Sequence, residues 1–275
     1  TKNYKLTIDK RAVVSSNTVS IKDSSLIVPE MQWSIKKSYI QKSDMIMLDI
    51  IANNDWKRPI YFISPYGDSD IGVSDYLQLD GFAYRLIPIK TKSKDFLSIG
   101  RIDEELLYNN LMNKFHWGRM NQPDVNIDHN NQRTTSVLRI RSNFNRLADA
   151  LILKNKKDSA LAVLNKIVDL MPQKKYPYDF FMLGIIESYF KINETEKANR
   201  IVKDFLKSTT ENLRYYYSLG SRFDQSVDSD KQLNLQTLQQ LGSLTDAYGQ
   251  VELKSEIDKS LQQYMELYYQ SNSKK

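Results

Sequence analysis

The chain has 275 residues, of which 41% are hydrophobic and 26% are charged. This composition excludes a disordered chain, and the length is sufficient for two domains with cores of their own. The formal net charge is +6, but lysine and arginine are scattered among acidic residues and form no basic run. We therefore expect no nucleic-acid partner, because nucleic-acid-binding proteins gather their positive charge into patches or stripes.

Cysteine is absent, which excludes disulfides, thiolate catalysis and cysteine-ligated zinc. No apolar run reaches the roughly 18 residues of a membrane-spanning helix, and no signal segment opens the chain. The sequence begins at Thr1, inside a strand-like pattern. We therefore expect a fragment of a longer protein whose targeting or membrane segments lie upstream.

The first forty residues carry short strand-like patterns. Apolar and polar residues alternate at Tyr4, Leu6 and Ile8, at Val19 and Ile21, and at Met31, Trp33 and Ile35. Alternation with a period of two predicts half-buried strands. A helix then follows from Ser43, its predicted N-cap, through Ala52. Its predicted apolar face consists of Met45, Leu48, Ile51 and Ala52.

Mixed strand and helix patterns continue up to about residue 115. Pro59 leads into a predicted buried strand over residues 60–63, since proline favours an extended approach. The further predicted elements are a loop over residues 64–74, a helical turn over 76–79, a strand over 82–89 and a helix over 106–115. Together these patterns predict a small α+β domain with short strands, residues 1–133, whose last part is a long ordered connection.

Residues 134–275 are predicted to form an all-α domain that begins at an N-cap, Thr134 or Thr135. The predicted inward faces are Val137, Ile140, Phe144, Leu147 and Leu151; Ala160, Leu164, Ile167 and Met171; Tyr178, Phe181, Ile185 and Tyr189; and Ala198, Val202 and Phe205. Pro172 is expected to end the second helix, Pro177 to lie in the first turn of the third, and Asn193 with Glu196 to form a capping box.

The pattern of this domain repeats after thirty-eight positions. Leu147, Leu151, Ala160 and Leu164 return as Ile185, Tyr189, Ala198 and Val202. A helical pair repeated at a fixed period predicts a stacked array that resembles tetratricopeptide repeats. Two further helices, residues 231–248 and 251–269, are expected to close the array as its cap.

Complete catalytic or metal-binding motifs are not evident. The two histidines, His116 and His129, are not accompanied by a Gly-x-Ser-x-Gly elbow. The oxygen-bearing residues Asp124, Asp128, Asn130 and Asn131 fit either a calcium site or a solvated loop, but they lack the EF-hand glycine and glutamate. The run Asp103-Glu104-Glu105 indicates a charged helix start. We predict no catalytic residue, metal or cofactor.

Two aromatic-cationic groups are the strongest candidates for ligand binding. The first contains Trp56 and Arg58, and the second contains His116, Trp117 and Arg119. An aromatic face beside a guanidinium group suits a sugar ring or a phosphate. The alternative is that both tryptophans are core anchors with paired arginines.

Several segments resemble a known family. They are residues Asn53–Phe62, Tyr76–Ile89 and Asn110–Gly118, and Asp128 with Asn130 and Asn131. They are similar to the C-terminal region of bacterial polytopic membrane proteins akin to protein O-mannosyltransferases, a region long described as a domain of unknown function. The resemblance extends from about Leu48 to Phe205. The acids that such enzymes use lie in their membrane portion, so no catalytic residue carries over.

The resemblance implies a periplasmic, non-catalytic domain attached to an inner-membrane glycosyltransferase. Such a domain would position an acceptor protein, a glycan or the membrane portion of its own parent chain. The alternative is a tetratricopeptide-like protein-interaction scaffold with no glycan role. Whether the fragment is itself an enzyme, and which sugar and acceptor are involved, stays open.

Overall fold

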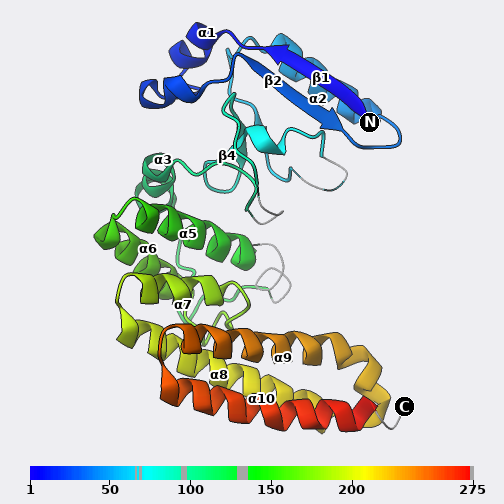
Figure 1. The fold of residues 1–275 in the computed structure, drawn as a ribbon, viewed down its shortest axis with the longest axis vertical. Coiled ribbons are helices and arrows are strands. Elements are labelled where there is room, and N and C mark those ends of the chain that lie inside the picture. Colours follow the sequence, from blue (N-terminus) through cyan, green and yellow to red (C-terminus); the bar gives the residue numbers. More distant parts are fainter. Residues whose placement is uncertain (66, 68–69, 94–97, 129–135, 273–275) are drawn as a thin grey trace. The chain divides into compact units, whose positions relative to one another are not determined.

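A computed structural model describes residues 1–65, 67, 70–93, 98–128 and 136–272 (Figure 1). The chain forms two compact units, residues 1–115 and 116–275. The first unit combines two small antiparallel sheets with helices, and the described part of the second is helical apart from its connections. The predicted fold class is confirmed. The predicted boundary after residue 133 lies outside the described residues and stays a prediction.

The first sheet pairs two strands that the alternation pattern predicts. Strand β1 (Lys2–Thr7) runs antiparallel to β2 (Glu30–Ile35), whose inward residues Met31 and Ile35 are fully buried. In the sequence, helix α1 (Lys10–Ser15) and a 3₁₀ helix (Ile21–Leu26) connect the two strands. The strand predicted at Val19 and Ile21 is therefore wrong. Ile21 is 80% exposed, so its alternation with polar residues reflects no buried face.

Helix α2 (Lys42–Asn53) confirms the predicted helix, but its buried face differs from the prediction. Gln41, not Ser43, is the N-cap, and Asp44 completes a capping box by accepting a hydrogen bond from the Gln41 N–H at 2.9 Å. Asp44 is buried and paired with Lys37 at 2.7 Å, which lowers its pKa. The inward face therefore runs through Asp44, Leu48 and Ile51, and Met45, which the pattern assigns to it, is 58% exposed.

The second sheet has the strand order β3-β5-β4 and is antiparallel throughout. Its strands are β3 (Tyr61–Phe62), β4 (Leu77–Leu79) and β5 (Tyr84–Leu86). The helical turn predicted over residues 76–79 is wrong. A 3₁₀ helix (Ser74–Tyr76) ends where β4 begins, because Leu77 and Leu79 are both buried in the sheet. Of the strand predicted over residues 60–63, only Tyr61 and Phe62 form a strand, β3.

A short helical segment closes the first unit. Helix α3 (Glu104–Tyr108) continues as a π-helix (Asn109–Lys114), which agrees with the helix predicted over residues 106–115. Asp103 is its N-cap and accepts a hydrogen bond from the Leu106 N–H at 3.1 Å. The acidic run is therefore a helix start, as predicted.

In the described part of the second unit, six α-helices form three antiparallel hairpins (Figure 1). They are α5 (Ser136–Leu153), α6 (Lys157–Leu170), α7 (Met182–Lys191), α8 (Thr195–Ser218), α9 (Asp224–Ala247) and α10 (Val251–Asn272). The predicted inward residues of α5 are all at most 7% exposed. The last pair begins earlier than predicted, at Asp224. Among the described residues, no helix is both long and apolar enough to span a membrane.

The three hairpins share one turn. Asn155 and Asn193, thirty-eight positions apart, both have a positive φ. After Asn155, the Lys156 N–H donates to the Leu151 carbonyl at 2.9 Å; after Asn193, the Glu194 N–H donates to the Tyr189 carbonyl, also at 2.9 Å. Gly249 occupies the same place in the third hairpin, where the Gln250 N–H bonds to the Thr245 carbonyl at 2.8 Å. The predicted capping box at Asn193 is therefore wrong, because this residue forms the left-handed turn and Glu194 is the N-cap.

Candidate functional site

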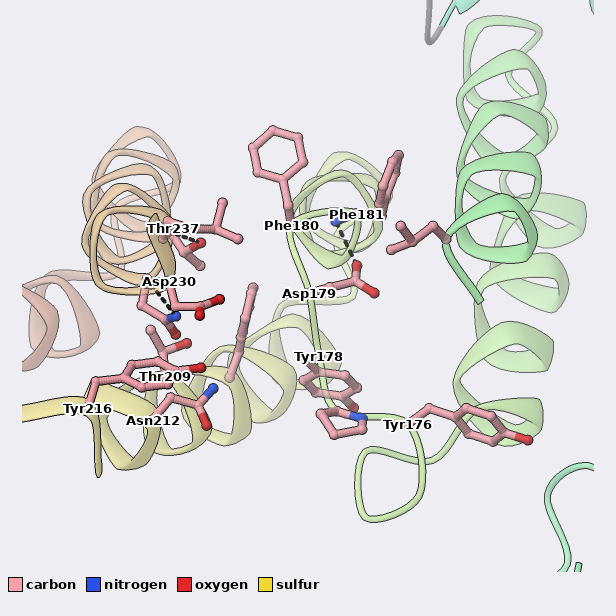
Figure 2. A pocket seen from close by; sticks show the side chains of 15 residues that line it. Tyr176, Tyr178, Asp179, Phe180, Phe181, Thr209, Asn212, Tyr216, Asp230 and Thr237 are labelled. Atoms are coloured by element: carbon pink, nitrogen blue, oxygen red, sulfur yellow. Dashed lines mark hydrogen bonds between the residues drawn. The ribbon is translucent and has the colours of Figure 1, made fainter. Parts of the chain in front are cut away.

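The helical unit contains a pocket of about 400 Å³ at the place where the second hairpin departs from the repeat (Figure 2). Helices α5, α8 and α9 and the segment that precedes α7 form its walls. The lining residues are Leu138; Tyr176, Pro177, Tyr178, Asp179, Phe180 and Phe181; Phe205, Thr209, Asn212 and Tyr216; and Asp230, Leu233, Asn234 and Thr237. Every one of these residues belongs to the second unit.

The pocket exists because α7 is short. Helix α7 is the equivalent of α5 in the second repeat. If the thirty-eight-residue interval held, α7 would begin at Lys174, the position that corresponds to Ser136, but it begins at Met182. Pro172 ends α6, and Pro177 disfavours a helical conformation at the residue before it and has no N–H to donate. The prediction that Pro177 lies in the first turn of a helix is therefore wrong. A non-helical segment, residues 174–181, takes the place of about two helical turns.

The guanidinium group of Arg141 holds this segment. Arg141 is fully buried on α5 and donates hydrogen bonds to the carbonyl of Tyr176 at 2.8 Å and to that of Pro177 at 3.0 Å. It also forms an ion pair with Asp179. The Asp179 carboxylate accepts a further bond from the Phe181 N–H at 2.9 Å. One buried cation thus replaces the helical hydrogen bonds that the segment lacks.

The wall of the pocket is braced from outside the array. The Tyr176 side chain is buried, and its hydroxyl donates to the carbonyl of Met120 at 2.9 Å. The Lys175 Nζ atom donates to the carbonyl of Gln122 at 2.7 Å. The connection predicted upstream of the helices therefore packs against the segment before α7.

Aromatic rings supply much of the pocket surface. The Tyr178 ring meets the Phe205 ring edge-on at 6.0 Å and lies 5.8 Å from the guanidinium carbon of Arg141. Burial raises the pKa of the Tyr178 hydroxyl, so this group stays protonated at neutral pH. Phe180 is 41% exposed. The pocket therefore offers apolar ring surface next to a neutral hydroxyl.

Polar side chains face these rings. Figure 2 shows Thr209, Asn212 and Tyr216 on α8 and Asp230 on α9, opposite Tyr178 and Asp179. The Thr237 hydroxyl and the Asn234 amide bond to carbonyls of their own helix, those of Leu233 and Asp230, each at 2.8 Å. By contrast, the Tyr178 and Thr209 hydroxyls, the Asn212 amide and the Asp230 carboxylate bond to no described side chain or backbone group.

The first aromatic-cationic group lies in the first unit. Trp56 is only 8% exposed and packs in the core with residues such as Ile51 and Phe62. Asp55 and Trp56 both have a positive φ, a turn that directs the indole inward, while Arg58 is exposed. The Trp56 indole is therefore largely covered by its own core. Ligand binding at Trp56 and Arg58 stays a prediction.

The second aromatic-cationic group lies in the second unit. His116 is exposed, Trp117 is half-buried against the ring of Phe144 at 5.3 Å, and Arg119 pairs with Asp124. None of these residues lines the pocket. The two predicted groups thus belong to different units. Ligand binding by His116, Trp117 and Arg119 also stays a prediction.

Part of the alternative calcium site falls on described residues. Asp124 is exposed and paired with Arg119, and Asp128 is exposed, whereas Asn130 and Asn131 lie outside the described residues, as does the second histidine, His129. Within the described ranges, no three acidic or histidine side chains are arranged to hold a metal ion.

The residues that form the pocket were not predicted as a site from the sequence. Arg141 falls on the same face of α5 as Val137 and Phe144, so a charge within an apolar stripe was the available signal. Asp179 was not identifiable in this way, because the two residues are far apart in the sequence and meet only when α7 begins late. Thr209 lies four residues after Phe205 on the buried face of α8, and its position in the sequence does not show that a pocket opens there.

Comparison with known proteins adds one finding. No curated protein and no solved structure matched the chain. Residues 1–106, which make up most of the first unit, match the family model described as TMEM260-associated domain 2.

Proposed function

We propose that this chain is a non-catalytic extracytoplasmic domain of a membrane-embedded glycosyltransferase, and that it positions a glycan-bearing acceptor near that enzyme. The observation that carries the proposal is the match of residues 1–106 to a domain associated with TMEM260, a protein O-mannosyltransferase-like protein. The resemblance noted in the sequence points to the same class of enzyme; two of its segments lie within residues 1–106, and the resemblance extends beyond them to about Phe205. A bacterial, periplasmic setting is part of this proposal.

The architecture supports a positioning role. Stacked helical hairpins offer long surfaces on which each repeat contacts only its neighbours, and such arrays commonly act as binding scaffolds. The pocket before α7 interrupts this surface with aromatic and polar groups, a combination typical of ligand sites. A domain of this kind can raise the local concentration of an acceptor without taking part in the chemistry.

A deletion experiment in the source cells tests the proposal. The coding sequence of residues 1–275 is removed while the rest of the parent gene is retained, and O-linked hexose on extracytoplasmic proteins is measured by mass spectrometry. We expect strongly reduced glycosylation although the truncated parent is still present in membranes by immunoblot. Unchanged glycosylation, or the absence of any membrane protein in the parent gene, contradicts the proposal.

The non-catalytic part of the proposal has its own test. The purified 275-residue chain is incubated with a lipid-linked sugar donor and an acceptor peptide. We expect no transfer by the chain alone. Sugar transfer by the isolated chain, lost in His116→Ala, would identify it as an enzyme instead.

A second candidate function is a protein-interaction scaffold without a glycan role. The observation that favours it is the turn shared by all three hairpins, which makes the second unit a regular array like those that grip peptides. Cross-linking in membranes followed by purification distinguishes the two functions. Capture of a separate protein, with normal glycosylation after deletion of the chain, favours the scaffold.

A further inference from the structure

We infer that the pocket in front of α7 binds the ring of a neutral sugar. The inference deepens the proposed function and rests on it for the biological source of the sugar, but the ligand chemistry comes from the pocket itself. Three properties of the lining carry it: aromatic surface, unpaired hydrogen-bonding groups and the absence of a cation among the lining residues.

The aromatic surface suits the apolar face of a sugar ring. Tyr178, Phe180 and Tyr216 line the pocket, and Phe180 is 41% exposed there. Aromatic side chains combine a large contact area with few rotatable bonds, so they make rigid platforms at low entropic cost. A volume of about 400 Å³ lies at the lower end of the range for small-molecule sites, which fits one or two sugar rings.

Thr209 is the sharpest indication that the ligand carries hydroxyl groups. It is only 2% exposed, and it lines the pocket from α8 (Figure 2). The neighbouring hydroxyls of Ser208 and Thr210 bond back to helix carbonyls, whereas that of Thr209 bonds to no described group. A nearly buried hydroxyl without a protein partner loses free energy if an apolar ligand covers it.

Three further groups complete the set around the pocket. The Tyr178 hydroxyl and the Asn212 amide can donate and accept hydrogen bonds, and the Asp230 carboxylate can only accept them. Sugar hydroxyls are both donors and acceptors, so they can pair with groups of each kind. An apolar peptide side chain in the same place would offer these groups no hydrogen bond.

The charges of the lining select against anionic ligands. The lining contains two carboxylates, Asp179 and Asp230, and no lysine or arginine. Asp179 is neutralised by the buried guanidinium of Arg141, which leaves Asp230 as the exposed charge. A phosphorylated or carboxylated sugar would therefore be repelled, and a neutral sugar would not.

Titration of the purified chain with methyl α-mannoside, methyl β-glucoside and methyl β-galactoside tests the inference, with chemical shifts followed by NMR. We expect at least one sugar to bind with a dissociation constant of about 1 mM, a weak affinity typical of a site with few contacts. Thr209→Val keeps the branched shape and removes the hydroxyl, so it should weaken binding about two- to tenfold.

A matched control lies one residue away. Thr210 is on the same helix, but its hydroxyl bonds to the Leu206 carbonyl at 2.9 Å, and the residue does not line the pocket. Thr210→Val should leave sugar binding unchanged. Phe180→Ala should weaken binding about tenfold through loss of the ring surface. Circular dichroism of each variant verifies that the fold is retained.

The outcomes separate this inference from its alternatives. Failure of all three sugars to bind overturns it, and so does binding that Thr209→Val and Phe180→Ala leave unchanged. If a peptide with an apolar side chain binds instead, Thr209→Val should tighten it, which is opposite in sign and also overturns the inference. Sugar binding together with normal glycosylation after deletion of the chain would refute the proposed function and leave the sugar site intact.

Discussion

Arg141 is a fully buried cation whose acceptors are the carbonyls of Tyr176 and Pro177 and the carboxylate of Asp179. Removing a charge from water is costly, and the cost is offset only when the group is paired and hydrogen-bonded. Arg141 meets this condition because the non-helical segment exposes carbonyls that need donors. The cation and the irregular backbone therefore stabilise each other.

Arg141→Ala should destabilise the helical unit by about 3 kcal/mol, since it leaves two carbonyls without their donor and the Asp179 carboxylate without its ion-pair partner. Urea unfolding at neutral pH measures the change. Arg200→Ala serves as the control, because Arg200 is exposed on α8 and should change the free energy of unfolding by less than about 0.5 kcal/mol. Equal effects of the two substitutions would contradict the structural role of Arg141.

The carboxyl group of Asp80 should make the stability of the first unit depend on pH. Burial raises the pKa of its carboxyl above the ordinary value of 3.8, and the ion pair with Arg85 at 2.9 Å only partly opposes this shift. Between these two pKa values the folded state binds more protons than the unfolded state, so stability falls as the pH rises. The free energy of unfolding of the wild type, relative to that of Asp80→Asn, should therefore fall as the pH increases above 3.8 and then level off.

Urea unfolding of both proteins over a pH series measures this difference. The Asn variant keeps the size of the side chain and cannot ionise, so the comparison isolates the carboxyl group. A relative stability of the wild type that rises with pH would mean that the Arg85 pair, not burial, dominates.

At the scale of the element, the hairpin turn depends on one residue with a positive φ. Gly249 has φ +68°, and no atom lies within 4 Å of the position that a Cβ atom would occupy, so only its backbone conformation opposes a side chain. Asn155 and Asn193 occupy the same place in the other hairpins, and asparagine tolerates the left-handed region better than most residues. The three turns thus use the two residue types best suited to this conformation.

Gly249→Ala should cost about 1 kcal/mol, because alanine resists a positive φ. Gly220→Ala is the matched control: a Cβ there also meets no atom within 4 Å, but its φ lies outside the left-handed range. This substitution should be neutral or slightly stabilising, since it restricts the unfolded chain. Thermal unfolding of the two variants tests the difference, and equal shifts would contradict the role of the turn.

Long periodic elements were predictable, and elements decided by polar contacts were not. The inward face of α5 follows from apolar spacing alone, because packing against α6 and α7 rewards that spacing. In α2 the buried ion pair between Lys37 and Asp44 changes the face, and no periodicity of apolar residues encodes it. The late start of α7 likewise depends on Arg141, a contact between distant positions.

For the whole molecule, each unit has fully buried leucines of its own. Leu77 belongs to a cluster of buried residues that lies wholly within the first unit, and Leu238 is buried in the second. Truncation of a buried leucine to alanine typically costs about 2–5 kcal/mol through lost burial and the cavity left behind. Since Leu77 packs in a cluster of the first unit, and Leu238 lies on α9, which packs against α7, α8 and α10, their effects should be independent.

Leu77→Ala, Leu238→Ala and the double variant test this independence by urea unfolding. The cost of the double variant should equal the sum of the single costs within about 0.5 kcal/mol. A larger departure from additivity would indicate that the two cores are energetically coupled.

The candidate site also marks the limit of prediction at this scale. Aromatic and cationic residues that are close in sequence predict ligand groups at Trp56 and Trp117. Trp56 is a core residue, and Trp117 packs on Phe144. The pocket instead gathers residues from Leu138 to Thr237. Local sequence patterns do not report such a site, because it arises from the packing of segments that are distant along the chain.

The short α7 also determines where the array opens most easily. In a stacked array each hairpin is held mainly by its neighbours, and α7 has 10 residues where α5 has 18 and α9 has 24. The first helix of the middle hairpin is therefore the shortest of the three and has the least surface to pack against the neighbouring hairpins. The amide protons of α7 should exchange with solvent sooner than those of α5 or α9. A ligand bound in front of α7 would slow that exchange, so occupancy of the pocket would become visible as rigidity in the centre of the array.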